Sequence, residues 1–310
     1  MTGAVLGPTA TYVQAATVDE AVAALAAGAR PVAGGTDLVV GARHGKAPLP
    51  AALVGIHRLP ELASLDAGPR GLRIGATVTH AVLVAHPAVL AGWTGLADAC
   101  AIIGSVATRA RGTIGGNVMN ASPAMDTGAP LLCLEAVAVL RGPGGERRLP
   151  VEELWTAPGT VSAAPDELLV ALELPPVPQG PAPTSAGSAY VRLQYRRQME
   201  IAVVGAAAAV RVSDGVVTSA RIAITALAPT VRRVPAAEAA LVGGRPDEGV
   251  LAEAARLAAD AALPISDVRA SAAYRRAMAE VVVHRAVRTA LTRALGGVVP
   301  VPASATTFGS

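Results

Sequence analysis

Two short glycine-rich motifs contain the residue types in this sequence that could do chemistry. AGGTD spans residues 33–37, and TIGGN spans residues 113–117. Adjacent glycines let several backbone N–H groups converge on one point, which suits an anion such as a phosphate. Thr36, Thr113 and Asn117 add side-chain donors. Two such motifs facing each other from different lobes predict a binding site for a diphosphate.

Neither motif matches a standard nucleotide signature. The second lacks GxGxxG spacing, and the sequence contains no GxxxxGK followed by Ser or Thr. A single glycine pair is more often a plain turn or β-bulge. The functional interpretation therefore depends on the pairing of the two motifs.

Other chemistry is sparse. His44, His57, His80, His86 and His284 are scattered, without the spacing of a metal site or a catalytic triad. Cys100 and Cys133 stand far apart in apolar, helix-like contexts, which predicts two buried, reduced thiols. No cysteine pattern for an iron–sulfur cluster is present. We therefore predict no catalytic side chain and no metal site in this chain.

The composition limits the partners. Of the 310 residues, 52% are hydrophobic but only 2% are aromatic, so a bulky planar ligand would fill a large part of the core. The net charge of +3 is spread along the chain, which argues against nucleic acid. The first residues lack the pattern of a signal peptide, and no apolar run reaches the roughly 20 residues of a membrane span. These features predict a soluble, cytoplasmic protein.

Hydrophobic periodicity and turn signals predict an α+β fold with three regions. Residues 1–58 form a first lobe, with a helix over 17–27 that begins in a Thr17–Glu20 capping box. Behind it, a strand, a helix starting at Thr36 or Asp37, and a strand over 52–57 predict a small parallel sheet. Residues 59–176 form a larger α+β lobe. Its predicted strands cover 71–76, 135–142, 145–150 and 167–175, and its predicted helices cover 79–84, 94–103 and 127–134.

The third region, residues 177–298, is expected to be a small antiparallel sheet with helices. The stretch 175–188 is rich in Pro, Gly and Ser and is typical of a linker or crossing loop. A β-hairpin turns at SDG, residues 213–215, and residues 235–296 have helical periodicity. The tail, residues 299–310, is expected to be disordered.

AGGTDL, TIGGNVMNASPAMD and RRQMEIAVVGAA, in this order and at these separations, resemble the flavin subunit of the molybdenum hydroxylases. This family includes the medium chain of carbon monoxide dehydrogenase and the flavin domains of xanthine dehydrogenase and 4-hydroxybenzoyl-CoA reductase. The resemblance covers residues 8–295. It implies a two-lobed FAD-binding fold of the vanillyl-alcohol-oxidase/PCMH type, followed by the C-terminal domain.

The resemblance also implies which residues contact non-covalent FAD. The motifs would wrap the diphosphate, and Asp126 would contact the ribose or adenosine, although it could equally cap the following helix. Leu169 and Arg192 match positions near the isoalloxazine. Leu169 could equally be a core residue of its strand, and relatives carry Lys in place of Arg192. Some relatives have an aromatic residue at the position of Ile103, a His at the position of Thr36 and a Tyr at the position of Ile201. The implied set is Pro31, Val32, Ala33, Gly34, Gly35, Thr36, Asp37, Leu38, Ile103, Thr113, Ile114, Gly115, Gly116, Asn117, Asp126, Leu169 and Arg192.

By the same resemblance, the chain would be an electron-transfer subunit of an oxidoreductase complex. Electrons would come from a large molybdopterin-binding subunit and pass through two 2Fe-2S clusters in a small subunit, and the complex would be a dimer of heterotrimers. The flavin would pass them to an external acceptor. Two alternatives are a free-standing FAD oxidoreductase and a flavin-free assembly or binding protein with the same fold.

Overall fold

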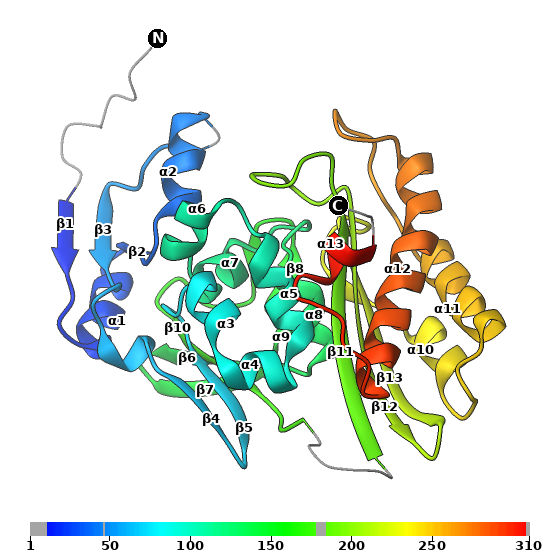
Figure 1. Ribbon diagram of the computed structural model, residues 1–310. Coiled ribbons are helices and arrows are strands. Elements are labelled where there is room, and N and C mark those ends of the chain that lie inside the picture. Colours follow the sequence, from blue (N-terminus) through cyan, green and yellow to red (C-terminus); the bar gives the residue numbers. More distant parts are fainter. Residues whose placement is uncertain (1–10, 46, 178–183, 308–310) are drawn as a thin grey trace.

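The computed structural model describes residues 11–45, 47–177 and 184–307, and its strands gather into three main sheets (Figure 1). The first sheet lies in residues 11–55, the second in residues 65–174 and the third in residues 184–233. This grouping supports the domain boundaries predicted near residues 58 and 176, which stay a prediction.

The first lobe is a three-stranded parallel sheet in the order β1-β3-β2. Helix α1 begins where the capping box predicts, because the Thr17 hydroxyl accepts from the Glu20 N–H at 3.1 Å and the Glu20 carboxylate accepts from the Ala16 N–H at 2.8 Å. Strand β1 has no counterpart in the sequence prediction. The elements are β1 (Thr11–Gln14), α1 (Val18–Ala26), β2 (Arg30–Val32), α2 (Thr36–Arg43) and β3 (Ala52–Gly55).

The second lobe contains a five-stranded antiparallel sheet in the order β4-β5-β10-β6-β7. The predicted strands are confirmed as β5 (Gly71–Gly75), β6 (Val137–Gly142), β7 (Gly145–Pro150) and β10 (Leu168–Leu174), and β4 (Leu65–Gly68) is added. Strand β10 is buried on both faces, since Leu169 packs among the lobe's helices while Leu168 packs in the core of the first lobe. The sheet therefore joins the two lobes through a shared central strand.

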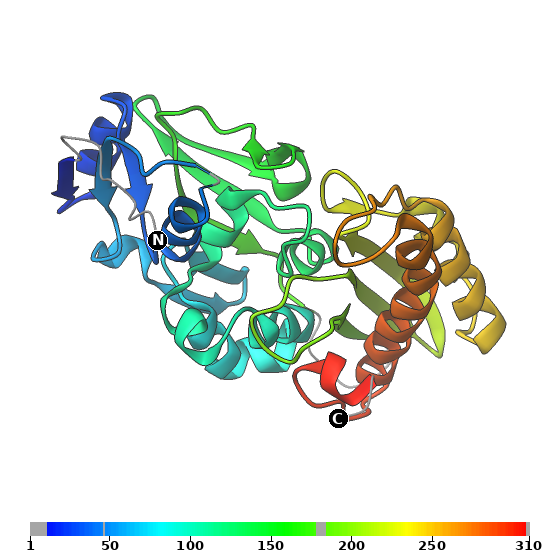
Figure 2. The ribbon, with the colours of Figure 1, turned by 90° about the horizontal axis from the view of Figure 1, so that it is seen from above.

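Short helices cover the face of this sheet that points away from α1 (Figures 1 and 2). The three predicted helices are confirmed as α3, α5 and α8. The remaining elements of the lobe surround them: η1 (Pro60–Leu62), α3 (His80–Ala85), α4 (Pro87–Gly92), α5 (Thr94–Ile102), α6 (Val106–Arg111), α7 (Ile114–Asn120), α8 (Gly128–Cys133), α9 (Val151–Leu154), β8 (Trp155–Ala157) and β9 (Thr160–Val161).

The C-terminal domain is a four-stranded antiparallel sheet in the order β11-β12-β13-β14, with its long helices on one face (Figure 2). The predicted hairpin is confirmed: Asp214 and Gly215 join β12 to β13 with φ of 52° and 76°, as a type I′ turn requires. Helices α5 and α8 of the second lobe contact the other face. The elements are β11 (Thr184–Leu193), β12 (Val204–Ser213), β13 (Val216–Thr225), β14 (Arg232–Arg233), α10 (Pro235–Leu241), α11 (Glu248–Asp260), α12 (Ala272–Ala294) and α13 (Ala303–Thr307).

The predicted linker is wrong for residues 184–188, which form the first half of β11. A residue without a side chain is needed in this part of β11, because a Cβ on Gly187 would stand 2.2 Å from the Ala290 carbonyl oxygen of α12. Glycine here lets the helix approach the strand closely. Residues 178–183 of the predicted linker lie outside the described residues.

The prediction of a disordered tail is also wrong for the part of it that the structure describes. Residues 303–307 form α13, and Ala303 and Ser304 are buried. The Ala303 N–H donates to Asp98 at 2.9 Å, and the Ser304 hydroxyl accepts from the Arg192 N–H at 2.9 Å. These buried contacts order a segment whose composition suggested fraying.

Both cysteines are free and buried, which confirms the predicted burial of the two thiols. Burial raises the pKa of Cys100 and of Cys133, so neither is poised as a nucleophile. Among the described residues, no helix has the length and apolar character to cross a bilayer.

Candidate functional site

The fold brings the two glycine motifs together at the junction of the two lobes. Gly34 lies directly against the backbone that precedes TIGGN, because a Cβ on Gly34 would stand 2.0 Å from the Arg111 carbonyl oxygen and 3.2 Å from the Gly112 Cα. From the same motif, the Thr36 hydroxyl lies 3.6 Å from where a Cβ on Gly112 would be. The two motifs therefore share one junction. Gly112, in the middle of this contact, was missed as a site residue.

The first motif presents backbone donors. Gly35 is the N-cap of α2, and its φ of 71° is a left-handed conformation that glycine adopts without strain. No hydrogen bond leads from the N–H groups of Gly34, Gly35 and Thr36 to another protein group in the described part of the chain. The amide groups at the N-terminal end of a helix carry partial positive charge, which favours an anion. This motif fits the phosphate role that its sequence predicts.

The second motif is a helix start, and the prediction of a loop with converging amides is wrong for it. Thr113 caps α7 by accepting from the Gly116 N–H at 3.1 Å. The N–H groups of Ile114 and Gly115 donate to the carbonyls of Val78 and Ala76 at 2.9 and 3.0 Å. Three amides that could have cradled a phosphate are thus bonded within the protein. What the motif offers is room, since a Cβ on the exposed Gly116 would meet only the Thr113 hydroxyl, at 3.0 Å.

His80 supports this junction from behind. The backbone N–H of His80 donates to the Gly112 carbonyl at 3.1 Å, and the imidazole ring lies 3.3 Å from where a Cβ on Gly112 would be. The side chain is buried, and Nδ1 has no hydrogen-bond partner among the described residues. Burial, with a smaller contribution from the charge of Arg109, lowers the pKa of His80 from 6.5 to about 4. The imidazole is therefore neutral at physiological pH.

The neutral state of His80 makes stability depend on pH. Between pH 6.5 and 4 the unfolded chain binds a proton at this residue and the folded chain does not, so acid favours unfolding. We expect His80 to account for a loss of about 2 kcal/mol between pH 7 and pH 5. Urea titrations at both pH values should show this loss in the native chain and a smaller loss in His80→Leu. An equal loss in both would contradict the assignment.

Asp126 and Arg192 form a buried ion pair. Arg192 Nη1 donates to Asp126 Oδ2 at 2.7 Å, and the Tyr190 hydroxyl donates to Oδ1 at 2.7 Å. Arg192 is fully buried and also donates to the Ile102 carbonyl at 3.0 Å. Burial raises the pKa of Asp126, and the charge of Arg192 opposes that rise. The pair thus links lobe two to the C-terminal domain, a role that the sequence did not reveal.

This network bears on the expected cofactor contacts of both residues. The helix-capping alternative for Asp126 is wrong, because the N-cap of α8 is Thr127 and no side chain caps this helix. The ribose contact of Asp126 and the flavin contact of Arg192 stay predictions. Leu169 is buried within the core, as its alternative interpretation held, and its contact with the ring also stays a prediction. Ile103 is half-buried at the end of α5.

Asn117 is well placed to contribute to the site. Its Oδ1 accepts from the Thr127 hydroxyl at 2.5 Å, which fixes the orientation of the amide. The amide nitrogen donates to no protein group in the described ranges. A neutral donor with a fixed direction is suited to a phosphate oxygen.

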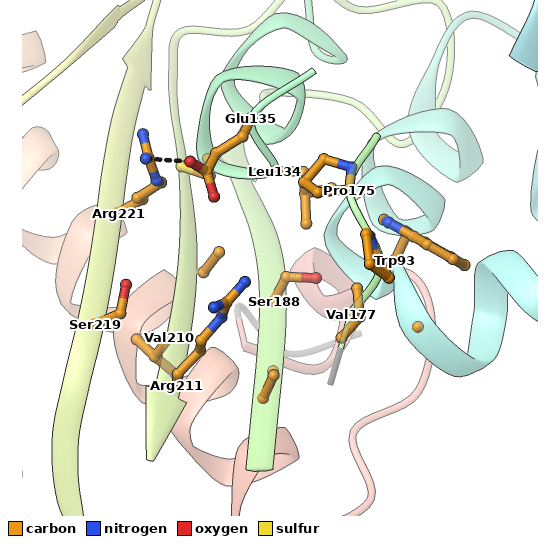
Figure 3. Close-up of a pocket in the computed structure, with 16 residues that line it drawn as sticks. Trp93, Leu134, Glu135, Pro175, Val177, Ser188, Val210, Arg211, Ser219 and Arg221 are labelled. Atoms are coloured by element: carbon orange, nitrogen blue, oxygen red, sulfur yellow. Dashed lines mark hydrogen bonds and ion pairs between the residues drawn. The ribbon is translucent and has the colours of Figure 1, made fainter. Parts of the chain in front are cut away.

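A separate cleft lies between the second lobe and the C-terminal sheet (Figure 3). Trp93, Leu134 and Pro175 form one side of it, and Arg211, Ser219 and Arg221 come from β12 and β13 on the other. Glu135 and Arg221 form an ion pair at its edge. None of the residues expected to bind the cofactor lines this cleft. The site at the lobe junction is therefore a different place on the molecule.

Two family models match the chain and divide it as the sheets do. The model described as the FAD binding domain in molybdopterin dehydrogenase matches residues 8–177. The model described as the CO dehydrogenase flavoprotein C-terminal domain matches residues 189–290. The first includes both glycine motifs, and the second includes the sheet that supplies Arg192.

Individual relatives agree with the family models. The carbon monoxide dehydrogenase medium chain of Hydrogenophaga pseudoflava is 34% identical over 79% of this chain and 83% of its own length. The xanthine dehydrogenase FAD-binding subunit of Escherichia coli O157:H7 is 33% identical over 74% of this chain and 78% of its own. A solved carbon monoxide dehydrogenase structure from Hydrogenophaga pseudoflava superimposes with a TM-score of 0.86 at 34% identity, over 93% of this chain and 99% of that one. The chain therefore belongs to the family of FAD-binding subunits of molybdenum-containing dehydrogenases, a family of oxidoreductases, and FAD is its cofactor.

Proposed function

We propose that this chain holds FAD non-covalently and transfers electrons through it, from iron–sulfur clusters of a partner subunit to an external acceptor. The contact between Gly34 and the Arg111–Gly112 backbone supports the proposal, because the two motifs expected to bind the diphosphate meet there. A cofactor with two phosphates matches two motifs on two lobes.

The donors of the junction would hold the diphosphate. The amides of Gly34, Gly35 and Thr36 and the side chain of Asn117 can each donate to a phosphate oxygen. A hydrogen bond to a charged group contributes roughly 1.5 to 3 kcal/mol, so these four donors together would contribute roughly 6 to 12 kcal/mol against the cost of association. Gly116 leaves the space that the phosphates need. The isoalloxazine supplies the redox chemistry, and the chain supplies position and electrostatics.

The relatives indicate the setting in which this transfer takes place. They are called medium chains or FAD-binding subunits, which names them as parts of larger assemblies. We infer a large molybdopterin-binding subunit and a small subunit with two 2Fe-2S clusters as partners, assembled as a dimer of heterotrimers. Within this assembly the flavin would receive electrons from the small subunit.

Removal of the space at Gly116 tests the cofactor site. We expect the native protein to be yellow and to release FAD, not FMN, when heat-denatured. Gly116→Val should be purified without flavin, because its branched side chain would occupy the phosphate space while only the Thr113 hydroxyl must move. Gly35→Val should also lose FAD, but valine is strained at its φ of 71°, so Gly116→Val is the cleaner variant.

Gly41→Val is the matched control, because a Cβ on Gly41 would meet nothing within 4 Å. It should keep its flavin. Full FAD content in Gly116→Val would refute the placement of the diphosphate, and covalently retained flavin would refute non-covalent binding.

A further inference from the structure

Three surface segments hold a disproportionate share of the exposed apolar side chains. They are residues 104–111, residues 194–201 and residues 262–276, about a tenth of the chain. Of the seventeen large apolar side chains that are exposed in the described part of the chain, eight lie in these segments: Val106, Tyr195, Met199, Ile201, Leu263, Ile265, Val268 and Tyr274. Val268 is 98% exposed. Such clustering is typical of a surface that another protein covers.

The three segments form one continuous surface. The Met199 N–H donates to the Gly104 carbonyl at 3.0 Å, and the Thr108 hydroxyl donates to the Met199 sulfur at 3.5 Å. The Tyr195 hydroxyl donates to the Arg269 carbonyl at 2.5 Å. The loop over residues 194–201 therefore touches both of the others. In Figure 1, this loop and the loop between α11 and α12 lie at the upper end of the molecule.

The charge of these segments is strongly positive. They contain seven arginines and only two acidic residues, a formal charge of +5, whereas the whole chain carries +3. The arginines are Arg109, Arg111, Arg196, Arg197, Arg269, Arg275 and Arg276, of which Arg275 is buried and paired with Asp267. Arg197 and Arg276 are exposed, and no ion pair is found for either among the described residues. An apolar centre with arginines around it favours a partner with an acidic face.

This surface adjoins the expected position of the flavin. Gly104, which binds Met199, follows Ile103, and Ile103 is expected beside the ring. Arg192 fixes the same loop from below, since it donates to the Glu200 carbonyl at 3.3 Å and to the Gln194 side chain at 3.0 Å. The rate of electron transfer falls steeply with distance. An electron donor would therefore have to dock close to this point.

We propose that residues 104–111, 194–201 and 262–276 form the docking surface for an acidic face of the iron–sulfur subunit. The inference rests on the proposed function, which requires an electron donor near the flavin. It adds the location of that donor and the kind of contact, in which arginines surround exposed Met199, Tyr195 and Val268.

Two variants test the docking surface in the complex isolated from its native host through an affinity tag on this chain. Arg196→Glu/Arg197→Glu reverses the rim charge, and Val268→Asp places a charge in the apolar part. Each should lower the ratio of iron to FAD in the purified complex by about tenfold, because like charges and a buried carboxylate disfavour docking. FAD per chain should stay unchanged. Arg70→Glu and Val298→Asp are the matched controls, and both residues are exposed, with Val298 beyond the C-terminal end of α12.

The outcomes separate this inference from the proposed function. An unchanged iron-to-FAD ratio in both variants overturns the proposed docking surface. The proposal also fails if the variants lose molybdenum but keep iron, or if they change only the self-association of this chain. Native complex that holds FAD without iron also overturns it. Native protein without FAD instead overturns the proposed function. If the double variant loses FAD as well, Val268→Asp decides, because its side chain is almost fully exposed.

Discussion

Replacement of Gly34 by alanine is expected to weaken FAD binding by up to about 100-fold. The added methyl group would stand 2.0 Å from the Arg111 carbonyl oxygen, a distance that non-bonded carbon and oxygen atoms do not reach. Because the oxygen belongs to the backbone, it cannot rotate away as a flexible side chain could. The two lobes must therefore separate. Overpacking of this kind costs about 1 to 3 kcal/mol, and at the upper limit FAD affinity would fall by about 100-fold. Titration of the apoprotein with FAD, followed by flavin fluorescence, measures the loss.

Gly41→Ala is the control for this variant. Gly41 lies in α2, a few residues from Gly34, and its Cβ would contact nothing within 4 Å. Alanine there should preserve FAD affinity and stabilise α2 by about 1 kcal/mol, since glycine is unfavourable inside a helix. If Gly34→Ala bound FAD as tightly as Gly41→Ala does, the contact between the motifs would not be needed for binding.

Asp98→Ala is expected to destabilise the fold strongly. Asp98 is fully buried and accepts two hydrogen bonds from Arg293, at 2.6 and 3.0 Å, and two from the N–H groups of Tyr190 and Ala303, at 3.1 and 2.9 Å. Alanine would leave the buried Arg293 charge without its carboxylate. Removal of one partner of a buried pair costs about 3 to 5 kcal/mol, which lowers the melting temperature by about 10 °C.

Asp19→Ala provides the comparison at the surface. Asp19 pairs with Arg141 at 2.7 Å, but its side chain is 77% exposed, so its loss should cost no more than about 1 kcal/mol. Thermal unfolding followed by circular dichroism would rank the two variants. Equal melting temperatures would show that Asp98 does not hold α5, β11 and α12 together.

Elements with a strong local signal could be predicted from the sequence. The Thr17–Glu20 capping box defines the start of α1, and the turn at residues 213–215 defines a hairpin, because the hydrogen bonds and φ values involved are local. Helix α7 could not be predicted in this way. Its sequence, IGGNVMN, has low helix propensity, and the helix depends on a backbone bond from Gly115 to Ala76 in a distant segment. From the sequence alone, the same glycines therefore predict a loop.

The candidate site was predictable in outline. The two glycine motifs do meet, which their pairing in the sequence indicated. The residues that each motif contacts were not predictable. Gly34, for example, lies against backbone atoms of residue 111, and such a contact has no sequence signature. The pairing of Asp126 with Arg192 spans 66 residues, and no local pattern specifies it. Long-range pairing is decided by the packing of the domains and not by neighbouring residues.

The contact at Gly34 also has an evolutionary consequence. One side of it requires the absence of a side chain, and the other side is a carbonyl oxygen that every amino acid carries. Natural variation is therefore constrained unequally: position 34 admits only glycine, while position 111 accepts many residues without harm to the contact. Covariation between homologues would leave no trace of this pair, although it joins the two lobes.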